Sequence, residues 1–371
     1  MAVVRQSGVE AAVERLEVSA YTIPTETAES DGTHEWDSTT IVVVELRAGG
    51  ERGLGYTYAP AAAGKLVEDE LADVVLGADP LRTGELWLAL GARLRNAGRP
   101  GIGFCAVSAL DLAVWDLKAR LLGVPLADLL GGTRDSVPLY GSGGFTSYSQ
   151  AELEQELAGW VEQGIPRVKM KVGRNPAADP ARVSAARAAV GGETELFVDA
   201  NGAYARKEAL VWAERFAAEW GVVWLEEPVS SADLEGLRLL RDRAPAGLEI
   251  AAGEYAYVPA DFRNLLAAGA VDCLQADVTR CGGVTGLLAA GAQAAAHGLD
   301  LSGHCAPAIS AHPLCALERL RHLEWFHDHV RIEAMLFDGV LEPAGGHLRP
   351  DPERPGHGLE LRRADAERYA A

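Results

Sequence analysis

The chain has 371 residues, 48% of them hydrophobic, and a formal net charge of −19. This length and hydrophobic content suffice for one large domain and a smaller one. The acidic excess argues against nucleic acid and anionic membranes as partners, because both bind basic surfaces. An anionic small-molecule substrate would need a local cation in its pocket.

Five cysteines are present without a CxxC pair, which favours a reduced cytoplasmic protein without structural zinc. The N-terminal segment, MAVVRQSGVEAAVERLEVSAY, lacks the apolar run of a secretory signal. No stretch approaches the ~18 consecutive apolar residues of a membrane span. We therefore expect a cytoplasmic protein that does not enter a membrane.

Residues 1–132 predict a small α+β unit. The β-branched run 38–47 and the segment 51–58 predict a hairpin around Ala48-Gly49-Gly50. Apolar residues at helical spacing predict helices at 61–77, 82–96 and 105–121. The Pro- and Gly-rich segment 330–371 is expected to pack back onto this unit and complete it.

Residues 133–329 repeat a short apolar strand and an alanine-rich helix. Strands are predicted at 137–141, 166–171, 195–199, 222–226, 249–253, 272–276, 299–302 and about 322–325. Helices are predicted at 178–190, 204–219, 231–243, 259–269 and 283–297. This alternation indicates parallel βαβ units, and eight strands predict a closed barrel of the α/β class. The alternative is a doubly wound sheet, although residues 141–144 match its glycine-rich phosphate loop only weakly.

An ionisable side chain lies at or just after the end of seven of these strands. In chain order they are Lys171, Asp199, Glu226, Glu254, Asp277, His304 and Glu324. The intervals are 20 to 28 residues, the length of one βα unit. Because parallel barrel strands all end at one rim, where active sites are built, we expect these groups to converge on one pocket.

Three of these groups predict a metal site. Asp199, Glu226 and Glu254 follow adjacent strands, which lie about 5 Å apart. Three unpaired carboxylates at that spacing would repel one another, and Mg²⁺ would resolve the repulsion, with Mn²⁺ as an alternative. The competing interpretation is three separate helix caps or salt bridges.

The remaining groups predict acid–base chemistry. Asp277 beside His304 would fix the imidazole tautomer and raise its basicity. Lys171, on the other side of the metal, shares its strand face with Lys169, so both should point inward. A lysine can act as a base near neutral pH where other cations lower its pKa. Chance placement on a solvated strand end is the alternative. Asn201, two residues after a metal ligand, is expected to contact the substrate.

Three neighbouring residues are expected to have supporting positions. Strand alternation predicts that Glu227 faces away from the metal and is structural. The same reasoning predicts that Cys305 faces away from the pocket and is no nucleophile. Arg280 is expected near the rim, behind the groups that touch the substrate.

Taken together, these segments resemble the enolase superfamily, in the mandelate racemase-like branch of the mandelate racemase/muconate lactonizing enzyme family. The matching segments are Lys169-Met170-Lys171, Asp199-Ala200-Asn201-Gly202, Glu226-Glu227-Pro228, Gly253-Glu254, Asp277 with Gly282-Gly283-Val284, His304, and Leu323-Glu324. The resemblance implies a modified (β/α)7β TIM barrel with an α+β capping domain, and a homo-oligomer. It implies Mg²⁺ bound by the three carboxylates, Lys171 and the His304–Asp277 dyad as acid–base catalysts, Lys169 at the substrate carboxylate, and Glu324 hydrogen-bonded to the enolate.

The expected reaction is removal of the proton next to a substrate carboxylate through an enolate. Dehydration of an acid sugar (an aldonate or aldarate) to a 2-keto-3-deoxy acid is favoured, partly because such enzymes are frequent among relatives with this dyad. Segments 22–36 and 55–58 would also place polar groups at the pocket entrance.

Racemisation or epimerisation of a 2-hydroxy acid is the main alternative reaction. Chemistry like that of muconate cycloisomerase fits less well, since it resembles a pattern with a lysine after the sixth strand and residues 208–371 contain no lysine. A non-catalytic binding or structural protein on the same fold is a remote alternative, because all seven strand-end groups are intact.

Overall fold

Three antiparallel strands begin the part of the chain that the computed structural model describes, residues 11–371. They are β1 (Arg15–Ser30), β2 (Glu35–Ala48) and β3 (Glu51–Tyr58), and they pair in that order. The helices that follow are α1 (Ala62–Leu66), the π-helical turn η1 (Val67–Leu71), α2 (Ala72–Val75), α3 (Thr83–Arg93), α4 (Ile102–Leu122) and α5 (Leu126–Leu129). The predicted hairpin and helices are confirmed, although a π-helical turn interrupts the first helix. β1 was not predicted.

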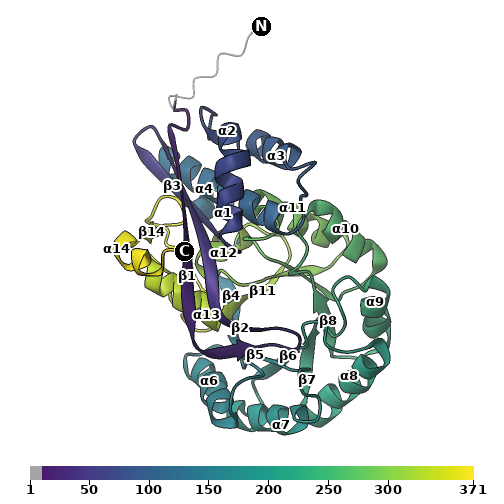
Figure 1. Cartoon of the computed structure of the whole chain (residues 1–371). Coiled ribbons are helices and arrows are strands. Elements are labelled where there is room, and N and C mark those ends of the chain that lie inside the picture. Colours follow the sequence, from purple (N-terminus) through teal and green to yellow (C-terminus); the bar gives the residue numbers. More distant parts are fainter. Residues whose placement is uncertain (1–10) are drawn as a thin grey trace.

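The β1–β2 hairpin leaves the cap and reaches across to the barrel (Figure 1). Its tip touches the loops after two barrel strands: the Thr33 hydroxyl donates to the Asn201 carbonyl oxygen at 3.3 Å. A Cβ atom on Gly32 would lie 2.2 Å from the Ala200 carbonyl oxygen. Only glycine therefore allows the tip to approach the rim this closely.

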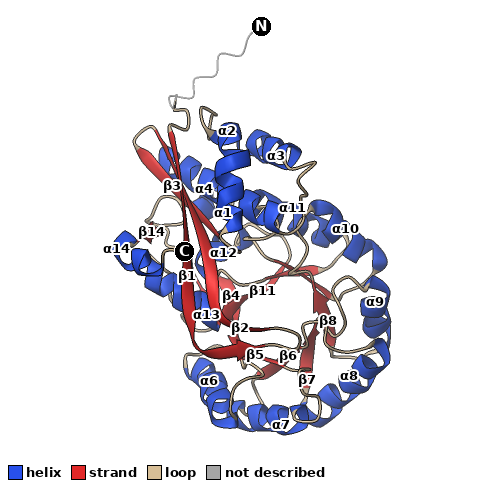
Figure 2. Cartoon of the chain, in the orientation of Figure 1, coloured by secondary structure: helices blue, strands red, loops and turns tan. Residues whose placement is uncertain are grey.

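Eight parallel strands form a closed barrel surrounded by helices (Figure 2). The strands are β4 (Val137–Gly143), β5 (Arg167–Lys171), β6 (Glu195–Asp199), β7 (Val222–Glu226), β8 (Glu249–Ala252), β9 (Cys273–Ala276), β10 (Asp300–Gly303) and β11 (Leu320–Phe326). They pair in sequence order, and β11 pairs with β4 to close the ring. The predicted TIM-like α/β barrel with a separate capping unit is confirmed.

Seven helices connect the eight strands and an eighth follows the last strand. They are α6 (Gln150–Glu162), α7 (Asp179–Val190), α8 (Arg206–Trp220), α9 (Leu234–Arg243), α10 (Pro259–Ala268), α11 (Gly283–Ala296), α12 (Pro307–Leu314) and α13 (His327–Leu336). Apolar faces of these helices pack on the outward side chains of the strands, which forms the main core. Within residues 11–371, no helix is long and apolar enough to cross a bilayer.

The C-terminal segment contains β12 (Phe337–Asp338), β13 (His347–Leu348), β14 (Glu360–Leu361), α14 (Arg363–Ala366) and the 3-10 turn η2 (Glu367–Tyr369). It returns to the cap: the imidazole of His357 hydrogen-bonds the Leu54 carbonyl of β3 at 2.7 Å. At the end of the chain, the Ala371 amide donates to the Ala20 carbonyl of β1. The proposed domain boundaries at 132/133 and 329/330 stay a prediction.

Large side chains fill the inside of the barrel below the rim. Tyr140, Phe197 and Trp224 form a buried cluster with Ala251 and Cys273. The Phe197 and Trp224 rings stack with centroids 5.3 Å apart. The inside of the barrel is therefore a packed core, and the cavity lies at its rim, where active sites of such barrels are built.

Candidate active site

The strand register aligns the predicted groups along the rim. Lys171 is paired with Asp199 across β5 and β6, and Asp199 is paired with Glu226 across β6 and β7. Glu254 follows the end of β8, after Gly253, where a Cβ atom would lie 2.1 Å from the Gln275 carbonyl oxygen. Glycine is therefore required for the chain to turn there and carry Glu254 to the rim.

A cavity of about 420 Å³ opens at this rim, between the barrel and the cap. Lys171, Asn201, Glu254, His304 and Glu324 line it from the barrel. The other predicted groups stand behind this lining, fully or almost fully buried: Lys169, Asp199, Glu226 and Asp277. The structure thus brings all nine predicted residues to one site.

Two lysines occupy the acidic side of the site. The Lys169 ammonium lies 2.7 Å from Glu226 and 2.7 Å from Glu324. The Lys171 ammonium lies 2.6 Å from Asp199. Asp199, Glu226 and Glu324 are therefore each paired with a lysine.

The charges in this cluster shift one another's pKa values. Burial, together with the charge of Asp199, raises the pKa of Glu226 to about 7. Burial lowers the pKa of Lys171, but the charges of Asp199, Glu226 and Glu324 together outweigh burial, and the pKa lies above its usual value. The sequence-based expectation of a depressed lysine pKa therefore does not describe this arrangement, because the carboxylates themselves hold the proton on the lysine.

The donor set fits a hard divalent cation. Asp199, Glu226 and Glu254 are 0 to 3% exposed and supply carboxylate oxygens from three neighbouring strands, the ligands that Mg²⁺ prefers. Burial is the main reason that the pKa of Glu226 is raised, and the charge of Asp199 raises it further. A cation there would compete with the lysines for the same oxygens and free them for the substrate.

The Asp277–His304 dyad is formed. The imidazole Nδ1 lies 2.8 Å from Asp277. The Thr279 amide and hydroxyl both donate to the other carboxylate oxygen at 2.7 Å, which orients Asp277. The imidazole Nε2 lies 2.5 Å from Glu254, at the cavity. Burial lowers the pKa of His304, but the negative charges around it outweigh burial and raise it.

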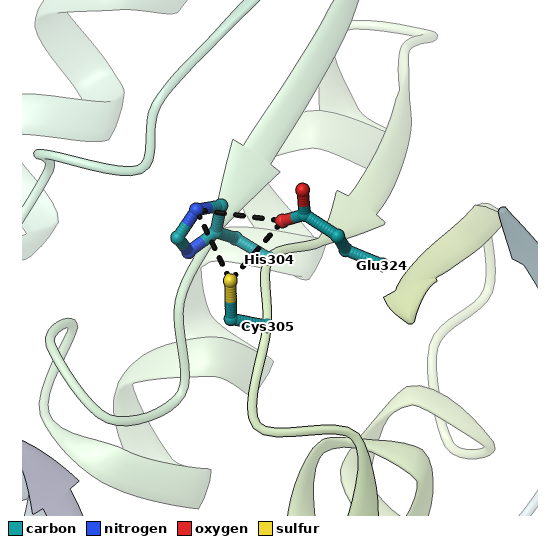
Figure 3. A group of neighbouring side chains, drawn as sticks. All are labelled: His304, Cys305 and Glu324. Carbon is teal, nitrogen blue, oxygen red and sulfur yellow. Dashed lines mark hydrogen bonds and ion pairs between the residues drawn. The ribbon is translucent and has the colours of Figure 1, made fainter. Parts of the chain in front are cut away.

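Figure 3 shows His304, Cys305 and Glu324 side by side. The Cys305 sulfur lies 3.4 Å from the imidazole Nε2 and 3.2 Å from a Glu324 oxygen. The prediction that Cys305 faces away from the pocket is wrong. Its φ of 53° is left-handed, so the alternation of the preceding strand no longer applies. Burial raises the pKa of its thiol, which disfavours the thiolate form.

Glu324 is an ionised acceptor in this arrangement. The Ser142 hydroxyl donates to it at 2.6 Å, and Lys169 pairs with the same oxygen. Burial raises the pKa of Glu324, but Lys169, His304 and Lys171 together outweigh burial, and the net shift is downward. Donation of a hydrogen bond to an enolate, as the resemblance implies, would require this carboxylate to gain a proton.

The prediction that Glu227 faces away from the metal ligands is also wrong. Its side chain is 2% exposed, and one of its oxygens is buried without a hydrogen-bond partner. Burial raises its pKa, and Glu254, Asp199 and Glu226 raise it further. Its φ of 38° turns the side chain out of the strand's alternation.

Left-handed backbone is concentrated at this rim. Among residues 11–371, the non-glycine residues with positive φ are Asn201, Glu227, Cys305 and Ala306. All four follow barrel strands at the site, as is typical of strain stored at functional positions. Asn201 lines the cavity, and its buried side-chain oxygen has no hydrogen-bond partner within the described protein, so it is free to accept from a substrate.

The cap supplies the opposite wall of the cavity. As expected, segment 22–36 contributes Asp31, His34 and Trp36, and segment 55–58 contributes Tyr58. Sequence reasoning missed Ser38, Thr39 and Thr40, which also line the cavity. They lie in β2, where a strand pattern does not reveal which end reaches the barrel.

Family models match nearly all of the described chain. The N-terminal domain of the mandelate racemase/muconate lactonizing enzyme family matches residues 13–131, and the enolase C-terminal domain-like model matches residues 152–366. The chain is 33% identical over 361 residues to a 3,6-anhydro-alpha-L-galactonate cycloisomerase from Streptomyces coelicolor (94% of this chain, 97% of the relative). It is 36% identical over 313 residues to an L-talarate/galactarate dehydratase from Salmonella typhimurium (81% and 77%).

Solved structures from the same family also resemble the chain. A mandelate racemase/muconate lactonizing enzyme-like protein from Rubrobacter xylanophilus matches with a TM-score of 0.95 and 60% identity, over 97% of this chain and 100% of that chain. A racemase from Streptomyces coelicolor with bound magnesium matches with a TM-score of 0.90 and 31% identity, over 97% and 100%. The chain is therefore an enzyme that belongs to the mandelate racemase/muconate lactonizing enzyme family of the enolase superfamily.

Proposed function

We propose that this enzyme removes the α-proton of an acid sugar with the help of Mg²⁺ and eliminates the oxygen on the neighbouring carbon, giving a 2-keto-3-deoxy acid. One observation carries the proposal: a single cavity is lined by both Lys171 and His304, with three buried carboxylates beside them. Dehydratases and cycloisomerases of acid sugars among the relatives support this reaction type.

Lys171 and His304 approach the cavity from different strands, β5 and β10, and so can act on different faces of a bound substrate. One of them takes the α-proton as general base; the imidazole, oriented by Asp277, can return a proton to the leaving oxygen. Lys169 stabilises the negative charge that develops on the substrate carboxylate. Mg²⁺ bound to Asp199, Glu226 and Glu254 would supply Lewis-acid stabilisation of the same charge.

Cycloisomerisation of an anhydro sugar acid is a second candidate, supported by the relative that aligns with 94% of this chain. It uses the same first step, and the oxygen that leaves the β-carbon belongs to a ring ether instead of a hydroxyl. The lack of a lysine in residues 208–371 disfavours chemistry like that of muconate cycloisomerase, and it leaves the opening of an anhydro ring possible. Racemisation of a 2-hydroxy acid remains the alternative in which a proton returns to the opposite face.

The test is α-proton exchange in D₂O, with Mg²⁺, across a panel of aldonic, aldaric and 3,6-anhydroaldonic acids, followed by assay for 2-keto acid. Keto acid from an open-chain acid supports dehydration, keto acid from an anhydro acid supports cycloisomerisation, and inversion without keto acid supports racemisation. Lys171→Ala and His304→Asn should each slow the reaction by about 10²–10⁴-fold.

Matched controls are available on the surface. Lys207→Ala and His297→Asn change exposed residues of the same types and should leave the rates unchanged. Undiminished exchange in the Lys171→Ala/His304→Asn double variant would overturn the proposed acid–base pair.

A further inference from the structure

We infer that the substrate carries a single carboxylate, as in an aldonate or an anhydroaldonate, and not the two carboxylates of an aldarate. This inference rests on the proposed function and concerns the end of the cavity far from the reacting carbon. A second carboxylate at that end would need a cation to bind it, because burying an unpaired charge is costly.

The strong cations that line the cavity are already paired with protein carboxylates. Lys171 belongs to the reaction centre and pairs with Asp199. Arg280 lies 3.5 Å from Asp277 and 3.9 Å from Glu254, and its guanidinium packs 5.1 Å from the Tyr255 ring centroid. Among the lining residues of the described chain, no other lysine or arginine is present.

His329, which lines the cavity beside Tyr58, does not replace them. Burial lowers the pKa of His329 to about 3, so this imidazole is neutral. Its ring stacks on Tyr58 with centroids 3.4 Å apart, and its Nδ1 accepts the Ala306 amide proton. His34 lies at the exposed hairpin tip, where its ring stacks on Trp36.

The cap side carries acidic groups instead. Asp31 and Asp328 both line the cavity, and both are largely buried. Asp328 is partly balanced by Arg331 at 2.8 Å and accepts a hydrogen bond from Thr39. Burial and then the charge of Asp328 raise the pKa of nearby Glu29 to about 8. A second substrate carboxylate would thus meet negative potential.

Neutral polar groups suit the hydroxyls of a polyol chain. Ser38, Thr39 and Thr40 line this wall with hydroxyls that can donate or accept. His329 carries its proton on Nε2, because Nδ1 is an acceptor, and that N–H has no protein partner among residues 11–371. Trp36 adds an indole face, against which the C–H groups of a sugar pack.

The experiment compares pairs of acids that share their configuration and differ at C6 alone: D-galactonate with galactarate, D-gluconate with D-glucarate, and D-mannonate with D-mannarate. The Mg²⁺-loaded enzyme is assayed for α-proton exchange and for keto acid. We expect kcat/KM for the favoured aldonate to exceed that of its aldarate on the order of 100-fold, because like-charge contacts cost several kcal/mol. An aldarate that reacts as fast as its aldonate, or faster, overturns the inference.

A substitution that adds a positive charge tests whether electrostatic repulsion causes the preference for an aldonate. Ser38→Lys places a cation on the cap wall, and Ser38→Met places a side chain of similar length without charge. For each variant, kcat/KM for the aldonate is divided by kcat/KM for the aldarate. This ratio should be at least about 10-fold lower in Ser38→Lys than in Ser38→Met. Equal ratios in the two variants overturn the electrostatic explanation. Absence of exchange with every acid in the panel, in contrast, refutes the proposed function itself.

Discussion

At the scale of single residues, Lys169 determines the charge balance of the site. It is fully buried and lies within 3.4 Å of Asp199, Glu226 and Glu324, three carboxylates from three other strands. Burial lowers its pKa, but these carboxylates outweigh burial and raise it. Lys169 is therefore a structural counter-ion as well as a candidate catalytic group.

Replacement of Lys169 by Met should destabilise the protein by ~3–5 kcal/mol in EDTA, because it leaves buried carboxylates without a partner. The loss should be smaller with Mg²⁺, since a bound cation supplies part of the missing charge. Urea unfolding with and without Mg²⁺ measures both values, with Lys207→Met as the exposed control. An equal loss in both conditions would contradict the proposed role of the metal.

The cysteines give a second prediction at this scale. All five are buried, and burial raises the pKa of each thiol, to about 11 for Cys315. Buried, protonated thiols are inert. Native protein at pH 7.5 should therefore not react with DTNB, whereas all five thiols should react in the unfolded protein. Rapid labelling of Cys305 in the native enzyme would show that the cavity activates this thiol.

At the scale of elements, the β1–β2 hairpin joins the cap to the reaction centre. Besides the contact of Thr33 with Asn201, the Thr146 hydroxyl donates to the Asp31 carbonyl oxygen at 2.9 Å, which fastens the tip to the loop after β4. Arg174, after β5, donates to the His34 carbonyl oxygen at 3.3 Å. The tip therefore positions the residues that close the cavity.

Gly32→Ala should move this tip away from the rim, because the new Cβ atom would overlap the Ala200 carbonyl oxygen. We expect kcat/KM to fall about 10-fold or more, as positioning contacts are lost. The unfolding free energy should change less than it does for a core substitution. Gly192→Ala is the control, since a Cβ atom there meets nothing within 4 Å. Unchanged kcat/KM in Gly32→Ala would argue that the tip does not shape the site.

At the scale of the whole molecule, the site joins elements far apart in the sequence. Two of the candidate metal ligands end β6 and β7 and the third follows β8, so a cation bound to all three would link three βα units of the barrel. Such binding stabilises the folded state in proportion to the logarithm of the metal concentration. The expected homo-oligomer stays a prediction.

Removal of Mg²⁺ should therefore lower the thermal stability of the enzyme. A Mg²⁺ concentration about 100 times Kd would add ~2.7 kcal/mol to the unfolding free energy. Calorimetry in EDTA and in Mg²⁺ measures the difference. Glu226→Gln should abolish most of it, and Glu162→Gln, an exposed control, should retain it. A Glu226→Gln variant with the full Mg²⁺ response would exclude this carboxylate as a ligand.

The sequence alone determined the barrel and the set of groups on its rim. The bounds of the eight predicted strands lie within two residues of the observed ones, because strand and helix periodicities are local. Lys171, Asp199 and Glu226 each end a parallel strand, so closure of the barrel necessarily brings them to one rim.

Only the tertiary structure decided how those groups face one another. Strand alternation failed at Glu227 and Cys305 because their backbone is left-handed. The sequence also left the cap wall undefined, since the contact of Gly32 with Ala200 joins segments more than 160 residues apart. The ionisation of each rim side chain likewise depends on side chains that are distant in the sequence. Local patterns therefore predicted which residues form the site, and long-range packing determined their orientation and ionisation.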